Sequence, residues 1–215
     1  MDIAILGGRL INPATYTDEI LNIGIKESRI SYIGSKHIAG NKIIDATGKV
    51  VAPGFIDIHV HEDSLVNGTA DKAPLHIFNC MARMGVTTCL GGNCGTGKYP
   101  TDRYINRIKG RLPINFGMLL GYNDLRRNVV GLGRHTKAFS CHVNRLISII
   151  SEELKSGLFG VSVGLEYDPG ITTEEILAVG DLLAMERKLL SIHYRYDVLS
   201  DSPGLDSMKE MLYIA

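Results

Sequence analysis

The chain has 215 residues, and its 23 lysines and arginines balance its 23 aspartates and glutamates, so the formal net charge is zero. This balance argues against a surface built for nucleic acid or an anionic membrane. Hydrophobic residues make up 45% of the chain and charged residues 21%, as in an ordinary globular protein. The first residues lack the basic and apolar segments of a signal peptide, and no stretch is long and apolar enough to span a bilayer. We therefore expect a cytoplasmic protein without nucleic-acid or membrane partners.

Short apolar runs separated by glycine, asparagine, proline and serine occupy the first fifty residues, which is the pattern of short strands. The predicted strands are Ile3–Leu6, Glu19–Ile25, Arg29–Ile33 and Lys42–Asp45. They predict a small antiparallel sheet, half of a β-sandwich, as a first domain over residues 1–51.

Strand-like and helix-like runs alternate from Gly54 onward. The predicted strands are Gly54–His61, Val86–Gly91, Ile114–Leu120, Gly160–Gly164 and Leu189–His193. The predicted helices are Ala73–Met84, Asp102–Lys109, Ser140–Ser156, Thr173–Arg187 and Pro203–Leu212. The strands are short, β-branched and apolar on both faces, as parallel strands covered by helices must be. This repetition predicts the α/β class for a second domain over residues 52–215.

The number of βα units limits the architecture of this second domain. About five units fit between Gly54 and Ala215, whereas a closed eightfold barrel typically needs roughly 250 residues. The sheet is then either open or the front part of a longer barrel. We predict a partial TIM-type (β/α) barrel of about five units, preceded by the small half-sandwich.

Residues with metal-binding side chains stand at the carboxyl ends of three predicted strands, which is where parallel α/β sheets hold their active sites. His59 and His61 end the first strand, where alternation places them on one face together with Asp57. Cys94 follows the second strand, and His193 ends the fifth. Imidazole and thiolate are ligands that zinc accepts. The four residues therefore predict a zinc site.

Each of these ligands taken alone has an ordinary structural explanation. A single buried cysteine usually serves packing, and a single histidine is usually a hydrogen-bonded neighbour of other groups. Their joint placement at corresponding strand ends favours the metal site. The other cysteines, Cys80, Cys89 and Cys141, are interpreted as core residues, and the other histidines are given no role.

Residues 92–98 read Gly-Asn-Cys-Gly-Thr-Gly-Lys and follow a predicted strand, so they fit most of a phosphate-binding loop. Such loops continue with a serine or threonine that binds magnesium, and Tyr99 stands there instead. Nucleotide binding is therefore kept as a secondary alternative.

Several of these segments together resemble the amidohydrolase superfamily, and within it the N-acyl-D-amino-acid deacylases, or D-aminoacylases. The matching segments are Ala52–His61, Gly92–Gly95, Gly121–Arg126, Gly164–Gly170 and Ser191–Arg195. The first is a signature of the whole superfamily, and the cysteine of the second is more specific. The third departs from the family, which commonly has histidine where Tyr122 stands, so the role of that position is left open.

The resemblance implies metal ligands at His59, His61, Cys94 and His193, with Cys94 able to bridge two positions and one or two zinc ions bound. Many relatives use a carboxylated lysine of the fourth strand, and this chain has no lysine there. The family also uses a histidine from the sixth strand and a general-base aspartate from the eighth. Family members are about twice as long, so both residues are expected beyond Ala215, as in a barrel of roughly 250 residues.

The resemblance implies zinc-dependent hydrolysis of the amide of an N-acyl-D-amino acid, the expected small-molecule partner. Arg195 is a candidate for gripping the substrate carboxylate, although a structural ion pair would explain it equally well, and Tyr167 is a candidate for lining the same pocket. The catalytic base stays unassigned. The nearby carboxylates, Asp57, Asp63 and Glu166, are expected to support the site or cap loops rather than to replace the base.

Two other interpretations stay open at this point. Instead of the first part of an active deacylase, the chain could be a metal-binding half-barrel without turnover. The open barrel edge would then favour self-association. A cyclic-amide hydrolase of the dihydropyrimidinase type is a further alternative. The missing lysine on the fourth strand argues against it.

Overall fold

The computed structural model describes residues 1–62, 76–196 and 202–215, which form two compact units, Met1–Gly54 and Phe55–Ala215. The sequence places the boundary between residues 51 and 52, and the structure divides the chain at Gly54. None of the helices in the described ranges is both long and apolar enough to cross a membrane.

The first unit is one five-stranded sheet. Its strands are β1 (Ile3–Asn12), β2 (Thr17–Lys26), β3 (Arg29–Gly34), β4 (Lys42–Asp45) and β5 (Val50–Val51), with a short 3-10 turn at Pro13–Thr15. The order is β3-β2-β1-β4, and β5 also pairs with β1. The sequence predicts a small antiparallel sheet, which holds for β1–β2 and β2–β3 but is wrong for β4 and β5, because both run parallel to β1. After β3 the chain crosses to the edge of β1 that is opposite β2, and apolar alternation alone does not distinguish a parallel from an antiparallel pairing there.

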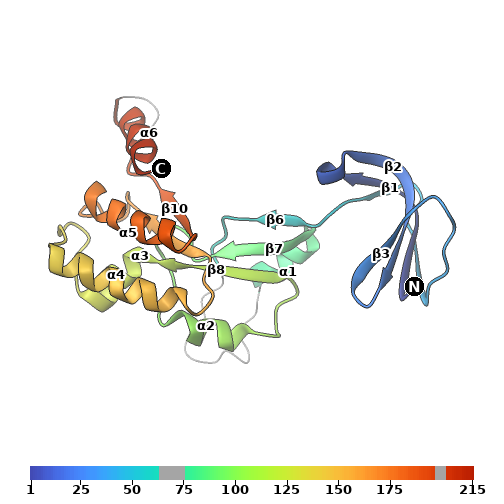
Figure 1. The fold of residues 1–215 in the computed structure, drawn as a ribbon, viewed down its shortest axis with the longest axis horizontal. Coiled ribbons are helices and arrows are strands. Elements are labelled where there is room, and N and C mark those ends of the chain that lie inside the picture. The colour runs from blue at the N-terminus through green and yellow to red at the C-terminus, as the bar shows by residue number, and fades with distance from the viewer. Residues whose placement is uncertain (63–75, 197–201) are drawn as a thin grey trace. The chain divides into compact units, whose positions relative to one another are not determined.

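The second unit is a five-stranded, all-parallel sheet in the sequential order β10-β9-β8-β7-β6 (Figure 1). Its strands are β6 (Phe55–Asp57), β7 (Val86–Gly91), β8 (Asn115–Gly121), β9 (Gly160–Gly164) and β10 (Leu189–His193). Its helices are α1 (His76–Arg83), α2 (Thr101–Ile108), α3 (Tyr122–Leu125), α4 (Ser140–Leu154), α5 (Thr173–Met185) and α6 (Ser202–Ile214), with a π-helical turn at Arg126–Val130. The partial (β/α) barrel predicted from the sequence is confirmed.

One continuous apolar core holds the helices of this unit against the sheet. Strand β9 is buried along its whole length. Its Val161 and Val163 pack in one cluster with Ile150 of α4 and Val179 of α5. Apolar residues at helical spacing give each helix one buried stripe, and burial of such side chains stabilises the fold by roughly 1.5–3 kcal/mol each. This core fixes the carboxyl ends of the strands, where the predicted ligands lie.

Candidate metal centre

His59 and His61 lie just past β6 rather than on it. The sequence predicted a strand through His61, and this is wrong, because β6 ends at Asp57. The Asp57 carboxylate accepts a hydrogen bond from the amide of His59 at 3.1 Å, which turns the chain out of the ladder. The amide of Val60 still donates to the carbonyl of Leu90, at 3.2 Å. The two imidazole rings therefore stay together, with centroids 5.5 Å apart in an edge-to-face arrangement.

Cys94 lies in the tight loop that follows β7, and its side chain is buried. Its backbone is left-handed, with φ of 56°, between Gly92 and Gly95, which have φ of 75° and 74°. A Cβ atom at Gly95 would fall 1.8 Å from Oδ1 of Asn123, so only glycine fits there. Burial raises the pKa of the Cys94 thiol. A bound cation acts in the opposite direction and favours the thiolate.

The donor atoms of His59, His61 and Cys94 all lie within 4.8 Å of one another. Sγ of Cys94 is 3.3 Å from Nε2 of His59. His193, from the end of β10, places Nδ1 3.7 Å from the same sulfur. The structure thus gathers three of the four predicted ligands in one cluster and sets the fourth beside the shared thiol. Two imidazoles and a thiolate form a donor set that suits zinc, so these residues fit the predicted metal.

The orientation of His193 is set by its neighbours in the β9–α5 loop. Oε2 of Glu166 lies 2.7 Å from Nε2 of His193, on the opposite side of the ring from Cys94. The ring of Tyr167 packs on the imidazole with centroids 4.7 Å apart. A carboxylate on the second nitrogen of a metal-binding histidine fixes the ring and its tautomer. Nδ1 is therefore the nitrogen that faces the cluster.

The other carboxylates near the cluster already have partners. Asp57 accepts the His59 amide, and Glu62 accepts the amide of Gly92 at 2.9 Å. Asp63 lies outside the described residues. Among the described residues, Asp57 and Glu62 thus bond to loop amides and Glu166 to a histidine, and the sequence predicts such supporting roles for Asp57 and Glu166.

Arg195, predicted to contact substrate, is engaged within the fold. Its guanidinium donates to both carboxylate oxygens of Glu210 on α6, at 2.8 and 3.1 Å. It also donates to the carbonyl of Ile171 at 2.9 Å. This is the ion pair that the sequence left open as the other explanation of Arg195. Burial raises the pKa of Glu210. The hydrogen bonds from Arg195 and Thr173 and the charge of Arg195 together lower it by more, so the pKa lies below its ordinary value.

Tyr122 has a structural partner as well. Its hydroxyl donates to Oε1 of Glu175 at 2.6 Å, and the same oxygen accepts Nε of Arg126 at 2.8 Å. All three side chains are buried. Burial, followed by the Glu175 charge, raises the pKa of the Tyr122 phenol far above its ordinary value. The residue that replaces the expected histidine therefore serves a buried network between α3 and α5.

Three buried polar residues that the sequence analysis did not assign hold the loop of Cys94 in place. Asn93 donates to the carbonyl of Leu90 at 2.8 Å. Asn123 donates to the carbonyl of Gly164 at 2.7 Å and accepts the amide of the same residue at 2.9 Å. Ser162 accepts the amide of Gly95 at 3.0 Å and donates to the carbonyl of Gly92. Their signal in the sequence was position alone: polar residues within or directly after apolar strands.

The remaining cysteines differ from one another. Cys89 is buried in the core, as predicted, and burial with the nearby charges of Asp57 and Glu62 raises its pKa to about 11. Cys80 and Cys141 are exposed on α1 and α4, so their prediction as core residues is wrong. Both stand on the solvent side of an amphipathic helix, which their residue type did not reveal.

The sequence of this chain is similar to those of several known proteins. Residues 42–119, which include His59, His61 and Cys94, match the model of the amidohydrolase family. A D-aminoacylase of Alcaligenes xylosoxydans xylosoxydans is 28% identical over 90% of this chain and 44% of its own length. The chain is an amidohydrolase homologue, related to the N-terminal part of D-aminoacylases.

Solved structures agree with this relationship at the level of the fold. The N-acyl-D-glutamate deacylase of Bordetella bronchiseptica, solved with zinc and a phosphonate mimic of the tetrahedral intermediate, superposes with a TM-score of 0.84 at 24% identity. The match covers 100% of this chain and 48% of that one. The L-hydantoinase (dihydropyrimidinase) of Arthrobacter aurescens gives 0.56 at 15% identity, over 90% of this chain and 40% of the other. The chain thus spans less than half the length of these relatives.

Proposed function

We propose that this chain supplies the zinc-binding part of an amidohydrolase that cleaves the amide bond of N-acyl-D-amino acids. The observation that carries the proposal is the cluster of His59, His61 and Cys94, whose donor atoms lie within 4.8 Å of one another. The D-aminoacylase and N-acyl-D-glutamate deacylase relatives support the substrate class. Turnover is proposed for a barrel in which these ligands are joined by a proton-accepting carboxylate.

The proposed ligands are His59, His61, Cys94 and His193, with Cys94 central because both His59 and His193 approach its sulfur. One or two zinc ions are compatible with a thiolate that can bridge. When bound, zinc lowers the pKa of a coordinated water to about 7 and polarises an acyl carbonyl. Glu166 and Tyr167 keep Nδ1 of His193 directed at the cluster. The chain's own contribution is thus a fixed set of donors at the mouth of the sheet.

Substrate contacts at Tyr167 and Arg195 belong to the same proposal. Tyr167 packs on the ligand His193, so a substrate at the metal would lie close to its ring. Arg195 is held by Glu210, and a substrate carboxylate would have to compete with that pair. An effect of Arg195 on substrate binding, separate from an effect on stability, would support its assignment.

A second candidate function is zinc binding without turnover. It is favoured by one observation: Asp57, Glu62 and Glu166, the described carboxylates beside the cluster, all serve other hydrogen bonds. A group that takes a proton from water must be within hydrogen-bond reach of it and free to accept. The dihydropyrimidinase-type alternative has less support, because no lysine follows β9 and the structural similarity to that enzyme is lower.

The deciding experiment measures zinc and activity in the same preparation. Zinc content is determined by mass spectrometry for the parent chain, His59→Ala and Cys94→Ala, with Cys141→Ala as the matched control because its thiol is exposed and lies outside the cluster. Cobalt substitution adds a second readout, since a thiolate ligand gives a charge-transfer absorption band that Cys94→Ala must lack.

Each outcome has a clear meaning. We expect bound zinc in the parent and in Cys141→Ala, and strongly reduced zinc in the other two variants. A parent chain without metal would refute the site. Hydrolysis of N-acetyl-D-amino acids by the zinc-loaded chain supports the deacylase, whereas bound zinc without hydrolysis supports the second candidate.

A further inference from the structure

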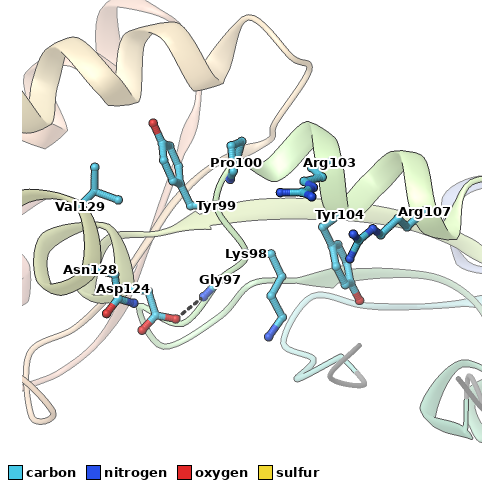
Figure 2. Close-up of a pocket in the computed structure, with 10 residues that line it drawn as sticks. All are labelled: Gly97, Lys98, Tyr99, Pro100, Arg103, Tyr104, Arg107, Asp124, Asn128 and Val129. Atoms are coloured by element: carbon cyan, nitrogen blue, oxygen red, sulfur yellow. Dashed lines mark hydrogen bonds between the residues drawn. The ribbon is translucent and has the colours of Figure 1, made fainter. Parts of the chain in front are cut away.

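A cavity separate from the metal cluster opens beside α2 (Figure 2). It has a volume of about 620 Å³ and is lined by the end of the loop after β7, by α2 and by the segment after β8. Pockets of about 300–1,000 Å³ are the size that holds small organic ligands. The lining residues are Gly97, Lys98, Tyr99, Pro100, Arg103, Tyr104, Arg107, Asp124, Asn128 and Val129.

The charges that line this cavity do not balance. Lys98, Arg103 and Arg107 are cationic, and the structure gives them no ion pair with any described carboxylate. Asp124 is the acidic residue among the described lining residues, and both of its oxygens have partners: one accepts a hydrogen bond from the Gly97 amide at 3.0 Å and the other from Arg127 at 2.9 Å. Among the described residues, three cations thus border a hollow whose one lining carboxylate, that of Asp124, is already hydrogen-bonded within the protein.

The two arginines also repel each other along the helix. Arg103 and Arg107 are four residues apart on α2, so their side chains share one helix face. Like charges at this spacing destabilise a helix. An anion between them and Lys98 would remove that destabilisation. In Figure 2 both arginines extend from α2, and Lys98 extends from the neighbouring loop.

The glycine-rich run at residues 92–98 contributes a side chain here and not a backbone cradle. In a phosphate-binding loop the amides point at the ligand. In this loop the amide of Gly92 donates to Glu62, that of Gly95 to Ser162, and that of Gly97 to Asp124. These amides are therefore not available to a nucleotide in the manner of a phosphate-binding loop. The side chain that this run contributes to the cavity is that of Lys98.

We propose that this cavity binds a phosphorylated small molecule that carries at least two negative charges, through Lys98, Arg103 and Arg107. Arginine suits the geometry of phosphate oxygens, and lysine adds a point charge. The volume exceeds what a single inorganic ion fills, and Tyr99 and Asn128 offer aromatic and amide surface to an organic part. A hollow site on a chain of zero net charge favours a small ligand over an extended polyanion.

The test is a calorimetric titration of the 215-residue chain with pyrophosphate after removal of metal by a chelator. Removal of metal matters because phosphates also coordinate zinc, and a site at the cluster would be lost by chelation. The variants are Lys98→Gln, Arg103→Gln and Arg107→Gln. Lys109→Gln is the matched control, because it removes one charge just after the same helix and outside this cavity. Thermal unfolding checks that every variant is folded.

We expect pyrophosphate to bind the metal-free chain, and each of the three substitutions to weaken this binding roughly tenfold, since each removes a charge-assisted hydrogen bond to the anion. Lys109→Gln should change the affinity less than twofold. Orthophosphate, with one phosphate group, should bind more weakly than pyrophosphate.

Three results would overturn the proposal. In the first, the metal-free chain does not bind pyrophosphate, or binding appears only with zinc and disappears in Cys94→Ala, which assigns the anion to the metal. In the second, Lys109→Gln loses as much affinity as the cavity variants, which indicates unspecific attraction. In the third, a single-stranded oligonucleotide binds more tightly than pyrophosphate, which indicates a nucleic-acid surface.

Discussion

The two ends of the loop that follows β7 differ in how their polar groups are satisfied. At the Cys94 end, backbone and side-chain groups are bonded to buried partners such as Asn123 and Ser162. At the Lys98 end, three cations surround a cavity without a free carboxylate among the described residues. The first arrangement fixes a ligand's position, and the second leaves charge for something outside the protein. Within a few residues, the same loop thus has one end whose polar groups are hydrogen-bonded inside the protein and one end beside cations without an ion pair among the described residues.

Gly95→Ala should have the largest effect of the variants at the Cys94 end of this loop. The new Cβ would meet Oδ1 of Asn123 at 1.8 Å on a backbone with φ of 74°. We expect a loss of about 3 kcal/mol in the free energy of unfolding, from overpacking plus left-handed strain, together with loss of zinc binding. Urea denaturation and zinc analysis measure both. Gly110→Ala is the control, since Gly110 has the same φ and nothing within 4 Å of an added Cβ, so about 1 kcal/mol is expected.

Ser162→Ala tests the same end more gently. Its hydroxyl is buried, and its removal leaves the Gly95 amide and the Gly92 carbonyl without their partner. We expect the free energy of unfolding to fall by about 2 kcal/mol, because the buried amide and carbonyl groups are left without hydrogen bonds. Ser156→Ala, which removes an exposed hydroxyl bonded to a carbonyl on α4, should cost less than about 0.5 kcal/mol. Equal losses in the two variants would contradict the role given to Ser162.

Glu166→Gln sharpens the comparison at the metal itself. Without the carboxylate on Nε2, the His193 ring is held less firmly with Nδ1 toward Cys94. We expect roughly tenfold weaker zinc affinity, at the lower end of what such partners contribute, with the fold unchanged. Competition with a chromophoric chelator measures the affinity. Glu152→Gln removes an exposed carboxylate paired with Lys155 and should leave zinc affinity as it was.

Arg195→Gln extends the comparison to an arginine that does have a carboxylate partner. This substitution should lower the free energy of unfolding by about 1 kcal/mol at pH 7, because the ion pair with Glu210 is partly shielded from water. The lowered pKa of Glu210 means that its contribution is present above the ordinary glutamate pKa near 4.5 and is lost as the pH falls through the folded value. Between pH 5 and pH 3 the free energy of unfolding should therefore fall more for the parent chain than for the variant. The difference should be about the contribution of the Arg195–Glu210 ion pair. Parallel curves in urea titrations across this range would contradict the assignment.

Much of the barrel unit follows from the sequence. Strands β7, β9 and β10 begin and end at the predicted residues, because parallel strands buried on both faces are short apolar runs with clear glycine or polar boundaries. The same logic placed Cys94 and His193 at strand ends that meet in space. Family relationship and fold are confirmed, whereas the roles of the individual ligands stay predictions.

Other features depend on contacts that a sequence does not display. The early end of β6 comes from Asp57 bonding to the backbone of His59, a choice between two conformations that alternation cannot decide. The partner of Arg195 stands 15 residues further along the chain, on α6. The cationic cavity needs α2 and the segment after β8 to meet, and neither carries a recognisable motif.

The anchoring of the Cys94 loop also has a consequence for the order in which the protein folds. Gly95 is fixed by Ser162, 67 positions later, and Cys94 meets His193 at a separation of 99. Such distant contacts form after local ones, since the intervening chain must first be ordered. His59 and His61 can therefore meet early, but the thiol joins them only when β9 and β10 are in place. Zinc affinity would then report how far the sheet has assembled during refolding.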